Sequence, residues 1–324
     1  MSFPRSVTVT AASRLHFGLF AFDASGGGGR RPSFGGAGMM IEEPHVCVRA
    51  CEADRLSVSG PASDRAAAVV ARLVDAGLLA EPPRCRLEVV DAPPQHGGLG
   101  VGTQLSLAVA VAVLRSQGIT PPDAVALAAL LGRGRRSAIG THGFASGGLL
   151  VDAGKRSADS VAPLAARVAL PPEWRVLLLL PAQSQSLSGD AEERAFAQLP
   201  PISSDTSGEL RRLATDEIVP AAAASQFERF AAAVSRFNAI SGDCFAAVQG
   251  GPYASPVAAR WVRRLGELGA PAGQSSWGPT LFAFAPDEQH AATLEETIRS
   301  RAIADGWRPR VVRPAVGGAR IDET

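Results

Sequence analysis

Residues 93–104 read Pro-Pro-Gln-His-Gly-Gly-Leu-Gly-Val-Gly-Thr-Gln, and an apolar segment, residues 105–114, follows at once. Four of the six residues 97–102 are glycine, so the backbone there can turn tightly and approach a ligand closely. The apolar segment meets no helix breaker before Gly118, which predicts a helix buried on nearly every side. N–H groups in the first turn of a helix, with the helix dipole behind them, favour a bound anion.

This glycine loop has two interpretations. It either binds phosphate, or its glycines only allow close packing before a buried helix. The chain has no Gly-Lys-Ser/Thr sequence, so the loop is not a Walker A loop. If it binds an anion, we expect the contacts to come from Gly98, Gly100, Gly102, Thr103 and Gln104.

Composition indicates a globular protein that binds small molecules. With 324 residues the chain is long enough for two domains, and 46% hydrophobic with 19% charged residues is ordinary. A net charge of +1 argues against a binder of nucleic acid or of membrane surfaces. Lys155 is the only lysine, so nearly all positive charge is arginine, which suits phosphate and carboxylate ligands. A genomic base-composition bias explains the arginine excess equally well.

The cysteines and the apolar segments indicate the compartment. The four cysteines, at positions 47, 51, 85 and 244, lack metal-ligand spacing, and no secretory leader precedes them. We therefore expect reduced thiols in a cytoplasmic protein. The longest apolar runs are shorter than the roughly 20 residues that span a bilayer, so no transmembrane segment is expected.

Residues 6–20 alternate in polarity, which predicts a half-buried strand. Arg14 and His16 then lie on the face opposite Leu15 and Phe17, two residues apart, as an anion or carboxylate site requires. A solvated strand face with a capping histidine has the same pattern. Further along, the glycine-rich residues 24–38 predict a loop, either one that closes over a ligand with Arg30 or Arg31 or a plain hairpin tip.

The remaining pattern predicts strands and helices in a mixed order. Strands are expected at residues 45–50, 55–58, 84–90, 147–152, 174–180, 281–285 and 307–312, and helices at 63–80, 121–131, 209–219, 226–245, 256–268 and 288–304. A basic turn at 133–136 and a loop at 137–143 follow the 121–131 helix; this loop either lines the same pocket as the glycine loop or simply connects the helix to the next strand. Irregular residues 156–172 mark a domain boundary. The order in the second half suggests a sheet covered by helices on one face, an α+β arrangement.

Two further features are candidate site residues. Asp152 ends a predicted strand, as either a turn former or a catalytic base. The loop Gln274-Ser275-Ser276-Trp277-Gly278 places small hydrogen-bonding groups and an indole just before a strand, and such loops often carry function on a rigid scaffold.

Taken together, these loops resemble the GHMP-kinase superfamily, and within it the β-ribofuranosylaminobenzene 5′-phosphate synthase family. The residues that carry the resemblance span nearly the whole chain in order: 13–19, 34–41, 98–104, 147–152, 249–251 and 273–280. The resemblance implies an α+β, GHMP-kinase-like two-domain fold. Its N-terminal domain, residues 1–165, would resemble ribosomal protein S5 domain 2, and its C-terminal domain, residues 166–324, would be ferredoxin-like.

The same resemblance implies a pentosyltransferase rather than a kinase. The kinase loop of the superfamily reads Gly-Leu-Gly-Ser-Ser, whereas Val101-Gly102 stands here in place of Ser-Ser. The third kinase motif is replaced by the 274–278 loop, and no aspartate stands at the usual catalytic position near Ser146. The implied reaction joins phosphoribosyl pyrophosphate to 4-aminobenzoate or 4-hydroxybenzoate, releasing carbon dioxide and pyrophosphate, in tetrahydromethanopterin biosynthesis.

On this interpretation Arg14, His16 and Asp152 are the catalytic residues. Arg14 would hold a carboxylate or phosphate, His16 would assist proton transfer or hydrogen-bond the substrate, and Asp152 would bind magnesium. The glycine loop would hold pyrophosphate, and Gln274, Ser275, Ser276 and Trp277 would bind substrate, the last three as the wall around the aromatic acid. We expect Mg²⁺ as a cofactor and no organic cofactor, although the sequence does not identify the full set of metal ligands. We also expect small-molecule substrates and a homodimer.

Two other functions stay open at this point. The chain is an ATP-dependent small-molecule kinase if the glycine loop keeps the use it has in the kinases. It is a catalytically silent binding protein if neither ATP nor phosphoribosyl pyrophosphate raises its melting temperature.

Overall fold

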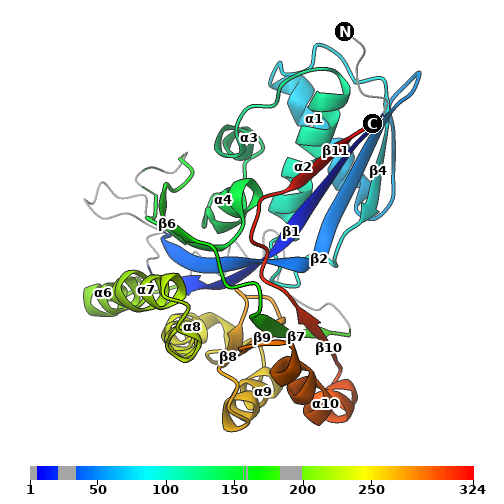
Figure 1. Cartoon of the computed structure of the whole chain (residues 1–324). Helices are drawn as coiled ribbons and strands as arrows, with labels where there is room; N and C mark the ends of the chain where they lie inside the picture. The colour runs from blue at the N-terminus through cyan, green and yellow to red at the C-terminus, as the bar shows by residue number, and fades with distance from the viewer. Residues whose placement is uncertain (1–5, 21–33, 156, 158–159, 183–198) are drawn as a thin grey trace.

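The computed structural model of the chain describes residues 6–20, 34–155, 157, 160–182 and 199–324 (Figure 1). These residues form a seven-stranded sheet and a four-stranded sheet, with helices packed against both. The predicted α+β class is therefore confirmed.

Two long antiparallel strands, β1 (Ser6–Leu19) and β2 (Gly36–Glu52), form the centre of the larger sheet. The second half of β2 pairs with β4 (Cys85–Asp91), to which β3 (Ser57–Ser59) adds in parallel. The first half of β2 pairs with β5 (Leu149–Asp152), and β5 with β6 (Leu164–Val168). The last strand of the chain, β11 (Arg320–Glu323), pairs with β1.

Helix α2 (Val101–Ser116) packs against β1 and β2 and is flanked by α1 (Ser63–Asp75), α3 (Ala124–Leu130) and α4 (Ile139–Ser146) (Figure 1). Every residue from Gln104 to Leu114 is buried. This confirms the prediction of a central helix that follows directly after the glycine loop.

The smaller sheet has the order β10 (Trp307–Val312), β7 (Arg175–Pro181), β9 (Leu281–Ala285) and β8 (Ala272–Gln274). One face packs against α9 (Pro256–Glu267) and α10 (Glu288–Ala304). The expectation of a single covered face was incomplete, because the other face packs against α8 (Phe227–Gln249) and the end of β1. There the ring of Phe17 lies 5.5 Å from that of Phe282, and Phe230 lies 5.2 Å from Phe284.

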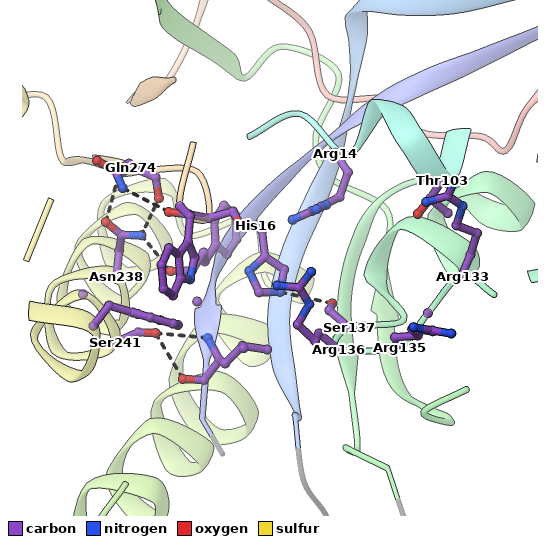
Figure 2. Close-up of a pocket in the computed structure, with 18 of the residues that line it drawn as sticks. Arg14, His16, Thr103, Arg133, Arg135, Arg136, Ser137, Asn238, Ser241 and Gln274 are labelled. Carbon is purple, nitrogen blue, oxygen red and sulfur yellow. Dashed lines mark hydrogen bonds between the residues drawn. The ribbon is translucent and has the colours of Figure 1, made fainter. Parts of the chain in front are cut away.

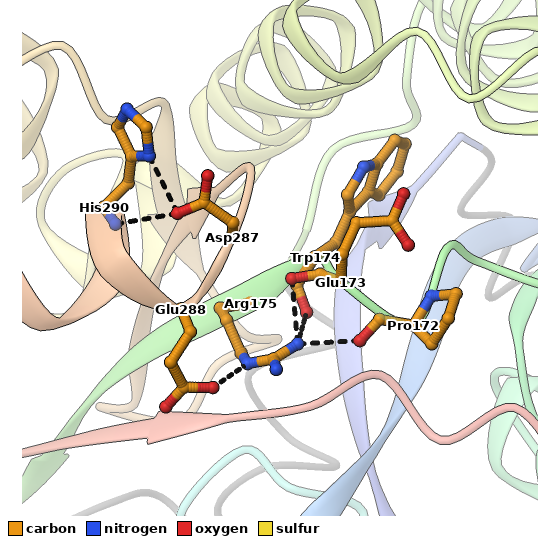
Figure 3. A network of polar contacts seen from close by, with 7 residues as sticks. All are labelled: Pro172, Glu173, Trp174, Arg175, Asp287, Glu288 and His290. Carbon is orange, nitrogen blue, oxygen red and sulfur yellow. Dashed lines mark hydrogen bonds and ion pairs between the residues drawn. The ribbon is translucent and has the colours of Figure 1, made fainter.

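The remaining helices precede α8: α6 (Ser204–Arg212), a π-helical turn η1 (Leu213–Ile218) and α7 (Val219–Ala223). Arg175 fastens the start of β7, as Figure 3 shows. Its guanidinium donates to the carbonyls of Pro172, Glu173 and Trp174 and pairs with Glu288 at the start of α10. This contact holds a helix on the smaller sheet, away from the cavity described below.

Three predicted irregular segments are regular in the structure. Gly36–Gly38 open β2, where a Cβ at Gly38 would lie 2.4 Å from the Leu15 carbonyl oxygen, so these glycines serve close strand packing rather than a turn. Most of the 137–143 loop forms the first turns of α4, and β6 lies inside the expected boundary 156–172. Residues 21–33, with Arg30 and Arg31, are outside the described residues, so the loop interpretation stays a prediction.

The division at residues 165 and 166 also stays a prediction. Strand β6 spans this position and belongs to the larger sheet. Strand β11 also belongs to the larger sheet, although it follows all strands of the smaller sheet in the sequence. Within the described part of the chain, no helix is long and apolar enough to cross a membrane.

Candidate active site

A cavity of about 390 Å³ opens between the two sheets, where β1 passes from one to the other. Its lining comes from β1, α1, the start of α2, the 131–137 turn, α8 and the 274–277 loop. Figure 2 shows two different walls, with His16 between them. On one side lie arginines, and on the other lie amide and hydroxyl side chains.

The arginine wall consists of Arg14, Arg72, Arg133, Arg135 and Arg136. Burial lowers the pKa of Arg133, and the neighbouring Arg65, Arg72 and Arg135 lower it further. Arg133 donates to the hydroxyl of Ser106, and Arg72 to the Leu131 carbonyl, both of them neutral acceptors. Among the described lining residues none is a carboxylate. Such a group of cations creates a strong preference for an anionic ligand.

The start of α2 contributes to the same wall. A Cβ at Gly100, the N-cap residue with φ of 70°, would lie 2.9 Å from Arg14 Nε. At Gly102 it would lie 3.2 Å from a guanidinium nitrogen of Arg65 and 3.5 Å from one of Arg133. The glycines therefore let guanidinium groups lie directly over the positive end of the helix dipole. An anion bound there would interact with both the guanidinium groups and the positive end of the α2 dipole.

The opposite wall is polar and aromatic. Asn238 donates to the carbonyls of Phe17 and Gln274 and accepts from the Gln274 N–H, which fixes β1 to β8. Ser241 bonds both backbone groups of Leu19. The rings of Phe245 and Trp277 meet edge to face at 5.1 Å. This wall suits a flat ligand with an apolar body and a polar end.

The loop containing residues 275–280 packs directly on the glycine loop. A Cβ at Gly98 would lie 2.4 Å from the Ser275 carbonyl oxygen, and one at Gly278 would lie 2.2 Å from the Gly98 nitrogen. Ser275 donates its hydroxyl to the Gly98 carbonyl and accepts from the His16 N–H. The Ser276 N–H donates to the His16 carbonyl. Both loops therefore hold the backbone of His16 at the centre of the cavity.

The side chain of His16 begins a chain of hydrogen bonds that leads away from the cavity. Its Nε2 lies 3.1 Å from the hydroxyl oxygen of Ser137, and that hydroxyl donates to Oδ2 of Asp152 at 3.3 Å. Asp152 is fully buried and also accepts from the backbone N–H groups of Gly36, Ala138 and Gly154.

Burial shifts the pKa of both His16 and Asp152, the two ends of this chain of hydrogen bonds. It lowers the pKa of His16 well below 6.5, and the charge of Arg14 lowers it further, so His16 is neutral at neutral pH. Burial raises the pKa of Asp152 to about 6, although its hydrogen bonds act in the opposite direction. The site therefore holds a neutral base linked to a buried carboxyl group.

The residues expected from sequence to form the site divide into two groups. Arg14, His16, Thr103, Gln274, Ser276 and Trp277 line the cavity. The others do not: Gly98, Gly100 and Gly102 lie in the loop beneath it, Gln104 donates to the Gly140 carbonyl, Ser275 is fully buried between the loops, and Asp152 lies behind Ser137.

Asp152 does not fit the magnesium role that we expected of it. Its two oxygens accept four hydrogen bonds, and it has no exposed surface. No group of three or more histidine, cysteine, aspartate or glutamate side chains within the described ranges is arranged to hold a metal ion.

Several lining residues were not among those predicted for the site. Arg72 lies on an amphipathic helix and has the sequence pattern of an ordinary solvated face. Asn238, Ser241 and Phe245 belong to a helix more than 200 residues from β1. For Asn238 and Ser241 the only sequence signal is polarity on an otherwise buried helix face, and Phe245 gives none.

The comparisons with known proteins agree with this geometry. Residues 218–304 match the family model described as GHMP kinases C terminal. A homoserine kinase from Cytophaga hutchinsonii has the same fold, with a TM-score of 0.68 and 15% identity over 99% of both chains. The chain is thus similar to GHMP kinases in its overall fold and, over residues 218–304, in sequence. The predicted two-domain GHMP-kinase-like fold is confirmed.

Two relatives are similar to this chain over nearly its whole length. Proteins named β-ribofuranosylphenol 5′-phosphate synthase from Archaeoglobus fulgidus and Methanothermobacter thermautotrophicus are 28% and 29% identical to this chain. Each alignment covers 93% of this chain, with 94% and 96% of the relatives. The family resemblance expected from sequence is thereby confirmed, and the ATP-dependent kinase is the weaker alternative.

Proposed function

We propose that this chain transfers the ribosyl 5-phosphate group of phosphoribosyl pyrophosphate to 4-hydroxybenzoate or 4-aminobenzoate, in tetrahydromethanopterin biosynthesis. The ring carbon that bears the carboxylate forms a bond to C1 of the ribose. The C1–O bond breaks, and its electron pair leaves with pyrophosphate. The bond to the carboxylate then breaks, carbon dioxide leaves, and its electron pair restores the aromatic ring.

One observation carries this proposal: a wall of five arginines faces an aromatic and amide wall across one cavity. The donor has a diphosphate and a 5-phosphate, which suit Arg14, Arg72 and Arg133 at the start of α2. The acceptor is a flat ring, which suits Trp277 and Phe245. A para hydroxyl or amino group supplies electrons to the ring, so no organic cofactor is needed.

His16 lies between the walls and exchanges a proton with the para substituent of the acceptor. Arg14 holds a phosphate or carboxylate beside it. We expect Mg²⁺ to accompany the diphosphate as its counter-ion. Because the described lining residues offer it no carboxylate, we assign no step to it.

The proposal extends to the protein's setting. All four cysteines are free thiols, which supports a reducing compartment, and we propose the cytoplasm. We also propose a homodimer, which light scattering on a size-exclusion column measures directly.

The direct test is conversion. Purified protein, phosphoribosyl pyrophosphate, magnesium and either acid labelled in its carboxyl group should release labelled carbon dioxide and form equal amounts of pyrophosphate. Carbon dioxide release no higher than without protein, for both acids, would contradict the proposal. ATP consumption that depends on an added alcohol would instead identify a kinase.

The arginine wall makes a sharper prediction. Arg133→Ala should raise the KM for phosphoribosyl pyrophosphate by about tenfold or more, because a charge-assisted contact contributes about 1.5–3 kcal/mol. It should not lower the melting temperature without ligand, because it removes a half-buried cation from among like charges.

The matched control is Arg299→Ala, an arginine that pairs on the surface of α10 with Glu295. It should leave the KM unchanged. An unchanged KM together with a lower melting temperature in Arg133→Ala would show that Arg133 supports the fold rather than binding the donor.

A further inference from the structure

Ser137 and Asp152 are well placed to control the proton on His16, although neither was expected to act in this way. We propose that they are positioning residues that hold His16 as the tautomer protonated on Nε2, so that Nδ1 offers its lone pair to the substrate in the cavity. This inference rests on the proposed function, because it assigns the atom that accepts the acceptor's para proton.

The direction of the chain of hydrogen bonds starts at Asp152. Three backbone N–H groups, of Gly36, Ala138 and Gly154, donate to its carboxylate, and a backbone N–H can only donate. These donors on both oxygens favour the ionised form, and at pH 7.5, above the raised pKa of about 6, the carboxylate accepts hydrogen bonds but donates none. The hydroxyl proton of Ser137 therefore points to Oδ2 of Asp152.

The other hydrogen bonds of the Ser137 hydroxyl follow from its donation to Asp152. Its hydroxyl has one proton, used for Asp152, and two lone pairs. One lone pair accepts from the Ile139 N–H at 3.3 Å, and the other faces Nε2 of His16 at 3.1 Å. Nε2 must then be the donor in that contact, so it carries the hydrogen.

The second ring nitrogen is therefore the basic one. Within the described part of the chain, Nδ1 of His16 makes no hydrogen bond, and His16 lines the cavity. The charged side chains among the described lining residues are Arg14 on the same strand, Arg72 on α1, and Arg133, Arg135 and Arg136 in the 131–137 turn. From α8 and the 274–277 loop come only uncharged groups, among them Asn238, Ser241 and Gln274. The cations disfavour a protonated ring, which leaves the lone pair available.

The proton movement balances. With a phenolic acceptor, the hydroxyl proton moves to Nδ1 as the ring carbon bonds to C1 and pyrophosphate leaves. Nε2–H, Ser137 and the Asp152 carboxylate stabilise the imidazolium that forms. When carbon dioxide leaves and the ring becomes aromatic again, the oxygen takes the proton back from Nδ1. His16 ends in its starting state, and no other reactant is required.

The tautomer can be measured without turnover. The chain has five histidines, so ¹⁵N-histidine labelling gives few signals, and His16→Gln assigns the one that disappears. Long-range ¹H–¹⁵N correlations at pH 7.5 should show His16 protonated on Nε2. In Ser137→Ala the same ring should become a mixture of tautomers. A wild-type ring protonated on Nδ1, or an unchanged pattern in Ser137→Ala, would overturn the proposal.

Kinetics supply the second readout. Ser137→Ala should lower kcat by about 10- to 100-fold, as loss of an orienting partner typically does, with the KM for phosphoribosyl pyrophosphate nearly unchanged. It should also shift the acidic limb of the pH profile of kcat/KM. Ser137→Thr, which keeps a hydroxyl, should restore most of kcat.

Ser146→Ala is the matched control, because its hydroxyl donates only to the His142 carbonyl within α4. It should leave kcat, the pH profile and the tautomer unchanged. Wild-type kcat and pH profile in Ser137→Ala would exclude the positioning role even if the proposed reaction occurs. Conversely, if wild-type protein forms no product, the proposed function fails, while the tautomer measurement still decides whether Ser137 orients His16.

Discussion

At the scale of single residues, Asp152 links the site to the pH dependence of stability. Burial raises the pKa of this carboxyl group from 3.8 to about 6. Between these pH values the folded state binds the proton more tightly than the unfolded state, so the contribution of Asp152 to stability falls as the pH rises. His16 acts in the opposite sense: its lowered pKa makes the folded state lose stability as the pH falls below 6.5.

Asp152→Asn separates the two effects. The unfolding free energy of wild type minus that of the variant should fall by roughly 3 kcal/mol from below pH 4 to pH 7, because each pKa unit corresponds to about 1.4 kcal/mol. The part of the His16 contribution that does not depend on Asp152 is present in both proteins and cancels in the difference. Urea unfolding at a series of pH values measures it. A difference that is flat over this range would show that Asp152 titrates at its ordinary value.

The sequence predicted the position of single site residues only where local periodicity assigns them to one face of a strand or helix. Alternation in the first strand put Arg14 and His16 on one face, and both line the cavity. The same reasoning could not find the contact of His16 with Ser137, because 121 residues separate them and only the folded sheet brings them together. It assigned magnesium to Asp152 because a carboxylate at a strand end gives no sign of whether backbone N–H groups will surround it.

At the scale of elements, the glycine loop depends on contact with the loop 275–280. Gly98→Ala should destabilise the protein by more than backbone strain alone, because its φ is 86° and its Cβ would lie 2.4 Å from the Ser275 carbonyl oxygen. It should also raise the KM for both substrates, since the two loops hold His16 and the start of α2.

Gly77→Ala is the control for backbone strain. Its φ is 72°, but nothing lies within 4 Å of the added Cβ, so it should cost only about 1 kcal/mol and leave kinetics unchanged. Unfolding by denaturant and steady-state kinetics on both variants give the comparison. Equal losses in the two variants would show that the close approach of the loops is unimportant.

Elements with a long, clear period were predicted well, and the short strands β3 and β5 were also found, but other short strands were missed. The helices that became α2, α9 and α10 and the strands β7, β9 and β10 lie within a few residues of their predicted bounds. The strands β8 and β11, with three and four residues, have too few positions for alternation to show. Gly36–Gly38 looked like a loop because glycine usually marks turns, whereas here it lets β1 and β2 approach.

At the scale of the whole molecule, the cavity exists only because the two sheets meet along β1. One wall comes from α1, α2 and the 131–137 turn, and the other from α8 and the 274–277 loop. The family resemblance gave the overall fold, but the composition of the second wall depends on how α8 packs against β1. No local pattern specifies that packing.

The return of the chain to its first sheet gives a prediction at this scale. Removing residues 320–324 deletes β11 and leaves the edge of β1 unpaired. Stability should fall by about 2–4 kcal/mol from lost strand hydrogen bonds and from Ile321, which packs on the core. The bare edge should also promote self-association, seen by light scattering.

Glu323→Gln is the matched control, because it removes only the exposed ion pair with Arg115 and should cost less than about 1 kcal/mol. A truncated protein with wild-type stability and an unchanged molar mass would show that β11 is dispensable.

The pairing of β11 with β1 also bears on synthesis in the cell. Strand β11 follows the whole smaller sheet in the sequence, whereas its partner β1 precedes it. During synthesis the larger sheet therefore keeps an open edge at β1 until β11 has emerged, even though most of its residues are already available. We expect the cell to protect this edge from other chains during that interval.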